Sequence, residues 1–286
     1  MRKLQFVTLA LMLCSQLVLA QQAATYRVGD IFKGPVKAVR TERTHFVREG
    51  DRAIESSPTL MKLTTYTLEG LSRESISYGT DGSVLERRIE RWRSDGKQID
   101  ISIFEAKDKL SLRIAYEYND FGLPVSETRY NPDGSVKEVR LVESDPGPNK
   151  IMGHTKVARN GSELERAVNT RDETNKTSRW TSTLADGSRT ENIHSLDPTK
   201  DHFTETLSYG PDGSLKSRRI SKSDRAVTRL EATEFDGKGN LLKKTLETRE
   251  YDARRNLIKL VNFRWNAELQ QFEPAAATYH RITYFE

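Results

Sequence analysis

A short turn motif recurs along almost the whole chain and limits what it can fold into. The motif reads Tyr, two residues, Asp-Gly-Ser and then Val or Leu, and clear copies start at Tyr78, Tyr130 and Tyr209. Looser copies fill the intervals, so that a turn signal falls every 12–14 residues. Glycines at 26-residue steps mark the longer period, namely Gly161, Gly187, Gly213 and Gly239. A persistent fixed period indicates a repeat architecture built from one supersecondary unit.

The Asp-Gly pairs at the centre of these turns predict β-hairpins. Asp-Gly and Asn-Gly supply positive φ angles at low cost, and an aspartate at this place can hydrogen-bond its own backbone. The alternative role is a Ca²⁺ site formed by a stacked ladder of these carboxylates. Each turn offers only one acid, however, and a calcium loop needs several. We therefore assign a structural role to the turn residues Asp81, Gly82, Asp133, Gly134, Asp186, Gly187, Asp212, Gly213 and Gly239.

The segments between the turns have the period of β-strands. Apolar residues alternate with polar ones at Ile99, Ile101 and Ile103, and again at Val261, Phe263 and Trp265. Period two predicts one buried and one solvated face, and strands joined by short turns are antiparallel. We predict an all-β fold: one long antiparallel meander of repeated hairpins, with 16–20 strands over residues 35–286 and an irregular loop at 50–60.

A single flat sheet of so many strands is not stable, because open twisted sheets curl, split or close by about ten strands. The apolar face must be buried, so the sheet curls into a barrel-like form, folds into two stacked layers, or packs against a partner. The periodicity does not choose among these arrangements.

The N-terminus predicts export. Arg2 and Lys3 precede an apolar stretch that ends at Leu19-Ala20, which is the pattern of a secretory signal peptide over residues 1–20. The alternatives are a membrane anchor, for which the apolar run is short, and a lipoprotein attached at Cys14. Residues 21–34 form an N-terminal arm in this scheme, and no later segment is apolar enough to span a membrane. We expect a periplasmic, extracellular or cell-surface location.

Cysteine usage and charge narrow the classes of partner. One cysteine excludes a disulfide framework and a cysteine-based zinc site. The 46 basic and 41 acidic residues alternate along the chain and are not grouped into blocks of one charge, as in Glu86-Arg87-Arg88-Ile89-Glu90-Arg91. Nucleic-acid binding therefore has little electrostatic support.

The repeated units resemble the tyrosine–aspartate (YD) repeats of the bacterial Rhs family, and the resemblance covers residues 66–265. Tyr251-Asp252-Ala-Arg-Arg-Asn256-Leu257 is a second form of the same unit. The resemblance implies an exported β-repeat protein from a family linked to carbohydrate binding, cell contact and toxin delivery, whose large members build a hollow shell around a toxic C-terminal domain. This chain is too short to enclose a toxin and lacks the self-cleavage motif, so only the scaffold is expected to transfer.

No catalytic, metal or cofactor site is predicted. The sequence has no Gly-x-Ser-x-Gly elbow, phosphate-binding glycine loop or dinucleotide fingerprint. The five histidines are dispersed; His194 and His202 would approach each other across a turn, yet solvent-facing strand ends are the commoner role for such residues.

Aromatic residues are the best candidates for ligand binding. An aromatic platform for sugar rings would use Trp92, Tyr118, Tyr130, Trp180 and Tyr209, although packing across strands is the commoner role for such rings. The favoured hypothesis is a non-enzymatic exported protein that binds an envelope glycan or a surface protein. The alternatives are a structural partner of a larger Rhs-type surface machine, able to self-associate through sheet edges, and a hydrolase on a β scaffold.

Overall fold

The computed structural model describes residues 32–286 except 51, 121, 145–150, 173, 198–200 and 225, and it describes 143, 144, 151 and 152 by their backbone alone. The predicted signal peptide (1–20) and nearly all of the predicted arm (21–34) lie outside the described residues, as does the Asp145-Pro146-Gly147 turn.

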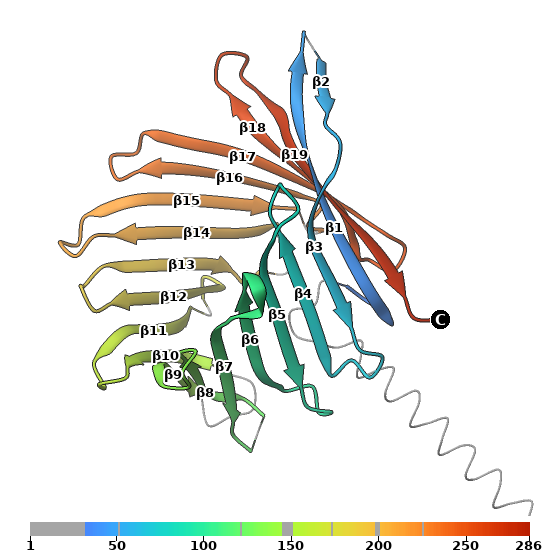
Figure 1. Ribbon diagram of the computed structural model, residues 1–286. Coiled ribbons are helices and arrows are strands. Elements are labelled where there is room, and N and C mark those ends of the chain that lie inside the picture. The colour runs from blue at the N-terminus through green and yellow to red at the C-terminus, as the bar shows by residue number, and fades with distance from the viewer. Residues whose placement is uncertain are drawn as a thin grey trace, which may run out of the picture.

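The described chain is an antiparallel meander of nineteen strands, which confirms the all-β prediction (Figure 1). One 3₁₀ turn, η1 (Ala106–Asp108), interrupts it between β6 and β7. The strands are β1 (Val36–Glu49), β2 (Arg52–Glu55), β3 (Thr59–Tyr66), β4 (Ser72–Tyr78), β5 (Val84–Trp92), β6 (Gln98–Glu105), β7 (Leu110–Tyr118), β8 (Pro124–Tyr130), β9 (Val136–Ser144), β10 (Ile151–Ala158), β11 (Glu163–Asp172), β12 (Thr177–Leu184), β13 (Arg189–Ser195), β14 (His202–Tyr209), β15 (Leu215–Ser223), β16 (Arg229–Asp236), β17 (Leu241–Tyr251), β18 (Leu257–Asn266) and β19 (Gln271–Tyr284).

The sheet closes on itself as a barrel. The last strand, β19, pairs antiparallel with β1, with Val39 opposite Ile282 and His45 opposite Ala276. In Figure 1 the blue β1 accordingly lies beside the red β19. On its other side β1 pairs with β3 through Ala38–Arg43 and with β2 through Phe46–Glu49. The closed ring therefore contains every strand except β2, and an even number of strands is required when all neighbours are antiparallel.

The region 50–60, which we expected to be an irregular loop, is largely strand. β2 and the start of β3 both pair with the long β1, and Ser56-Ser57-Pro58 separates them. Proline donates no hydrogen bond to a ladder, so it is placed where the pairing shifts from β2 to β3. The prediction missed β2 because its four residues carry no clear period-two pattern.

The predicted turns are confirmed, in a three-residue form with a bulge. The Gly82 amide donates to the Gly79 carbonyl oxygen at 3.0 Å, and the Gly79 amide donates to Ser83 at 2.8 Å. Gly82 has a φ of 80°, the left-handed conformation that such a turn requires at its last position. The Asp81 carboxylate accepts from the Ser83 amide and hydroxyl at 3.0 and 2.6 Å. The same Asp–Ser pair recurs at Asp133, Asp186 and Asp212, which explains the serine in the motif.

The register defines two continuous faces. On β5, Arg88 and Glu90 point to one face, while Arg87 and Arg91 point to the other. We name the first the inner face because its ion-paired arginines are more enclosed than those of the other face, apart from Arg87, which is 28% exposed. Side chains there are 22% exposed at Arg73, 35% at Arg88 and 36% at Arg129; on the other, outer face they are 54% exposed at Arg40, 55% at Arg91 and 70% at Arg281.

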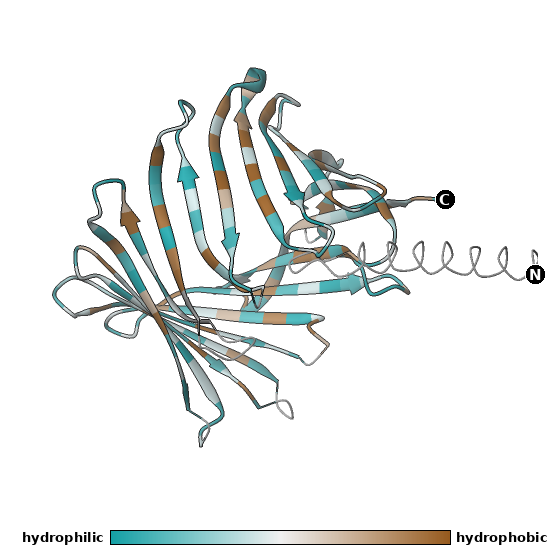
Figure 2. Ribbon diagram, turned by 90° about the horizontal axis from the view of Figure 1, so that it is seen from below, coloured by the Kyte–Doolittle hydropathy of each residue, from teal (hydrophilic) through white to brown (hydrophobic). Residues whose placement is uncertain are grey.

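Both faces mix apolar and charged residues, which corrects the expectation of a single apolar face (Figure 2). Val39, Ile101 and Ile114 are buried on the inner face, as are Leu246 and Val261 on the outer face. The physical reason is the width of the barrel: a ring of this many strands encloses more space than side chains fill. Polar groups on the inner wall therefore need cross-strand partners rather than an apolar filling.

Candidate functional site

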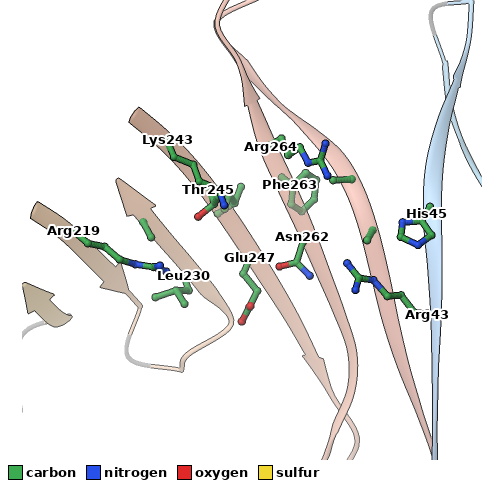
Figure 3. A pocket seen from close by; sticks show the side chains of 14 residues that line it. Arg43, His45, Arg219, Leu230, Lys243, Thr245, Glu247, Asn262, Phe263 and Arg264 are labelled. Carbon is green, nitrogen blue, oxygen red and sulfur yellow. The ribbon is translucent and has the colours of Figure 1, made fainter. Parts of the chain in front are cut away.

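A cavity of about 320 Å³ is hollowed into the inner face between β15 and β1 (Figure 3). Its lining comes from β15, β16, β17, β18, β19 and β1, so it exists only where the barrel closes. The lining residues are Arg43, His45, Arg219, Leu230, Ala232, Lys243, Thr245, Leu246, Glu247, Asn262, Phe263, Arg264, Ala275 and Ala276.

Strand register brings the polar residues of this cavity to one face. Arg219 on β15 is opposite Glu234, which is opposite Lys243 on β17. Thr245, two residues further along β17, is opposite Arg264 on β18. Because side chains two residues apart share a face, period-two patterning alone aligns these groups once the strands pair.

Four of the lining cations form what we call the cationic cluster: Arg43, Arg219, Lys243 and Arg264. Within the described part of the chain, no carboxylate oxygen lies within 4 Å of any of the four. Other inner-face arginines are paired; Arg129, for example, lies 2.9 Å from both Glu127 and Glu138. The cavity wall therefore carries four basic groups that form no ion pair within the described part of the chain.

Three acids lie near the cluster: Glu247, Glu234 and Glu273, the last of which lies on β19 opposite Arg264 and 3.6 Å from Arg48. Glu247 lines the cavity, but its carboxylate accepts a 2.5 Å hydrogen bond from Arg249 Nε on the same strand. Glu234 stands between Arg219 and Lys243 in the register and makes no ion pair within 4 Å with either. Because Glu247 and Glu273 each have another basic partner, positive charge remains in excess around the cavity.

The side chains are arranged to surround a bound group. In Figure 3, Arg219 and Arg43 extend their guanidinium groups from opposite sides toward the middle, where Glu247 and Asn262 lie. A guanidinium presents a rigid fork of donors that matches carboxylate and phosphate oxygens. The amide of Asn262 both donates and accepts hydrogen bonds. The arrangement suits an anionic ligand that also carries hydroxyl groups.

A second polar group on the inner face surrounds the buried His154. Its Nδ1 lies 3.1 Å from Arg140 and its ring packs against Trp180 with centroids 5.6 Å apart. Burial, followed by the charge of Arg140, lowers the pKa of His154 below its usual value. Glu165 accepts from the Ser182 hydroxyl at 2.5 Å, so that serine is bound to the acid rather than to the imidazole. A nucleophile–base pair is therefore not assembled there.

The five aromatic residues predicted as a sugar platform are divided between the two faces. Trp92, Tyr118 and Trp180 lie on the inner face, and Tyr130 and Tyr209 lie on the outer face. All five are half-buried. Four pack against cations of an adjacent strand or turn: Trp92 with Arg73, Tyr118 with Lys97, Tyr130 with Arg113 and Tyr209 with Arg189. They do not gather into one surface.

The turn aspartates are engaged by their own serines, as described above. Across the described ranges, no group of three or more His, Cys, Asp or Glu side chains is placed to hold a metal ion. His194 Nδ1 lies 3.1 Å from the Thr204 hydroxyl on the adjacent strand.

Sequence reasoning missed the cationic cluster. Its members lie on β1, β15, β17 and β18, up to 221 positions apart in the chain, and each is a single basic residue in an ordinary strand. Barrel closure places Arg43 beside the C-terminal strands, and no pattern within a single strand predicts that closure. The cluster becomes visible only in the final register of the strands, and that register was not available from the sequence.

No family model matches this sequence. The search of curated proteins also finds no match. No helix in the described part of the chain has both the length and the apolar character needed to cross a bilayer.

Solved structures give distant similarities only. A porin-like protein from Bacteroides uniformis is 11% identical with a TM-score of 0.35, over 87% of this chain and 97% of that chain. A porin-like protein from Bacteroides vulgatus is 9% identical with a TM-score of 0.33, over 85% and 97%. TcdB2-TccC3 without its hypervariable C-terminal region is 9% identical with a TM-score of 0.24, over 89% of this chain and 19% of that chain. At these values the similarities assign neither a family nor a function.

Proposed function

We propose that the protein is an exported, non-enzymatic barrel that binds a glycan of the cell envelope or its surroundings at the inner face. The observation that carries the proposal is the cavity between β15 and β1, whose wall holds four cations with no carboxylate partner within 4 Å among the described residues. A concave site with a few convergent polar groups is the usual form of a small-ligand site.

The closed ring supports binding over an assembly role. A sheet that assembles through its edges needs unpaired strands. Among the described strands, β2 alone pairs on one side only, and it has four residues. Self-association through so short an edge would be weak, so the alternative of a structural partner in a larger machine is the less supported one.

The cavity lining supports a binding role over hydrolysis. Glycoside hydrolysis uses a pair of carboxylic groups on either side of the scissile bond. Among the described lining residues, Glu247 is the one carboxylate, and it already accepts a hydrogen bond from Arg249.

Charges on both faces support an aqueous compartment. Arg91 and Asp100 pair at 3.0 Å on the outer face, and Arg88 and Glu90 pair at 2.5 Å on the inner face. A wall that faced lipid would present an apolar band instead. We place the protein in the periplasm or outside the cell, following the predicted signal peptide.

The repeated Asp-Gly-Ser turns support a relationship to Rhs-type scaffolds. Under that relationship the barrel is a small shell that holds a ligand.

Capture from native envelope material tests the proposal. The purified mature protein is immobilised, and bound polysaccharide and bound protein are eluted separately. Thr245→Trp fills the cavity, while Thr248→Trp on the same strand places the same bulk on the outer face. We expect saturable capture of polysaccharide that Thr245→Trp abolishes and Thr248→Trp preserves. Capture unaffected by Thr245→Trp, or capture of protein alone, would contradict it.

A further inference from the structure

We infer that the ligand is an acidic glycan whose carboxylate or phosphate groups are held by the cationic cluster, an inference that rests on the proposed function. The first argument for an acidic ligand is the charge of the cluster. One cavity is lined by Arg43, Arg219, Lys243 and Arg264, and in the described part of the chain none of them forms an ion pair within 4 Å, although Glu234 and Glu273 lie on neighbouring strands. Like charges gathered on a concave wall repel one another and concentrate counter-anions, so an anionic ligand relieves the repulsion and gains charge-assisted hydrogen bonds.

The second argument is the distance over which the cluster extends along the wall. Its outer members, Arg219 on β15 and Arg43 on β1, are five strand steps apart. At about 4.8 Å per step this is roughly 24 Å along the wall. Lys243 and Arg264 lie between them. One small anion cannot reach all four, so the ligand carries several anionic groups along an extended chain.

The third argument, which favours a sugar, comes from the uncharged and acidic residues of the lining. Thr245 and Asn262 offer both donors and acceptors, and Glu247 offers acceptors only. These groups suit sugar hydroxyls. Nucleic acid fits less well, because Glu247 would face a dense row of phosphates. The register turns the Phe263 ring to the outer face with Leu246, so among the described lining residues there is no row of the stacking platforms that single strands need.

Isothermal titration of the mature protein with two matched oligosaccharides tests the inference. One is an oligogalacturonate, and the other is the same oligosaccharide with its carboxyl groups reduced to hydroxymethyl groups. A phosphorylated oligomannose and a single-stranded oligonucleotide complete the set. We expect one of the two acidic sugars to bind, the reduced sugar to bind roughly tenfold or more weakly, and the affinity to fall as salt rises.

Adjacent residues on opposite faces provide matched variants. Arg219→Gln and Lys243→Gln remove inner-face charge, while Arg218→Gln and Lys244→Gln remove the same charge from the outer face. We expect each inner-face variant to weaken binding roughly tenfold, with the outer-face variants close to the wild type. Circular dichroism of all four checks that the barrel is intact.

The outcomes separate the inference from the proposed function. Equal affinity for the acidic and reduced sugars, or equal effects of Arg218→Gln and Arg219→Gln, would overturn the inference and leave glycan binding in the cavity standing. Tighter binding of the oligonucleotide than of any sugar would also overturn it. The proposed function itself fails if Thr245→Trp captures envelope polysaccharide as well as the wild type does.

Discussion

Asn256 donates a hydrogen bond from its side-chain amide to the backbone carbonyl oxygen of Lys33, 3.1 Å away and 223 residues earlier in the chain. The same amide donates to the Tyr284 hydroxyl at 2.8 Å, and Asn256 is fully buried. Lys33 leads into β1 and Tyr284 ends β19. The β17–β18 turn therefore fastens together both ends of the described chain at the seam where the barrel closes.

Replacing Asn256 with Ala should destabilise the protein strongly. The substitution removes the hydrogen bonds that the buried Asn256 side chain makes to the Lys33 backbone and the Tyr284 hydroxyl and leaves a cavity in their place, which costs about 2 kcal/mol or more. Urea unfolding measures the change. Asn160→Ala is the control, because Asn160 lies in an exposed turn and accepts only from Ser162; its cost should stay below about 1 kcal/mol. Equal costs for the two variants would show that Asn256 does not hold the seam.

Valine at the turn glycines should destabilise single hairpins. Gly134 and Gly213 have φ angles of 81° and 75°, and no atom lies within 4 Å of an added Cβ. The cost is thus backbone strain alone, about 1–2 kcal/mol per site. Thermal melting of Gly134→Val and Gly213→Val tests this, with asparagine at the same sites as the milder control because it tolerates positive φ. Unchanged melting temperatures would contradict the turn assignment.

Arg255→Gly should have the opposite effect. Arg255 has a φ of 63° at the place where the other turns carry glycine. Removing its Cβ relieves a strained conformation, and we expect a gain of about 1 kcal/mol. The denaturant midpoint should rise, while Arg254→Gly should not raise it, because the Arg254 guanidinium packs 4.4 Å from the centre of the Tyr284 ring.

Stability should fall at alkaline pH. Burial, with the nearby Glu127 next in effect, raises the pKa of Tyr116 from 10.0 to about 12, so the folded state keeps this proton more tightly than the unfolded state. The stabilisation is complete below pH 10 and is lost as the pH rises toward 12. Tyr116→Phe removes this group from the titration. Urea unfolding at pH 9 and pH 11 should show a smaller loss for Tyr116→Phe than for the wild type; equal losses would contradict the prediction.

Several features followed from the sequence because they depend on neighbours in the chain. The Asp-Gly-Ser turns could be located because the φ preference of glycine and the Asp–Ser hydrogen bonds act within five residues. The number of strands followed from counting turns. The short β2 was missed because a partner strand, rather than its own pattern, makes Arg52–Glu55 extended.

The candidate site depended on distant strands and was not foreseen. The aromatic prediction required Trp92 and Tyr209 to share one surface, yet the strand register places them on opposite faces. A one-residue shift moves every following side chain to the other face. Arg43 joined Arg264 only through the pairing of β1 with β19.

The sequence by itself determined the repeat, the hairpins and the all-β class, since each rests on local conformational preference and on period-two patterning. The tertiary structure alone decided that the sheet closes, which face is concave, and which cations meet at the seam. Closure depends on the twist and tilt of the strands, which accumulate over the whole ring before the first and last strands can pair. The cationic cavity between β15 and β1 is a product of that closure.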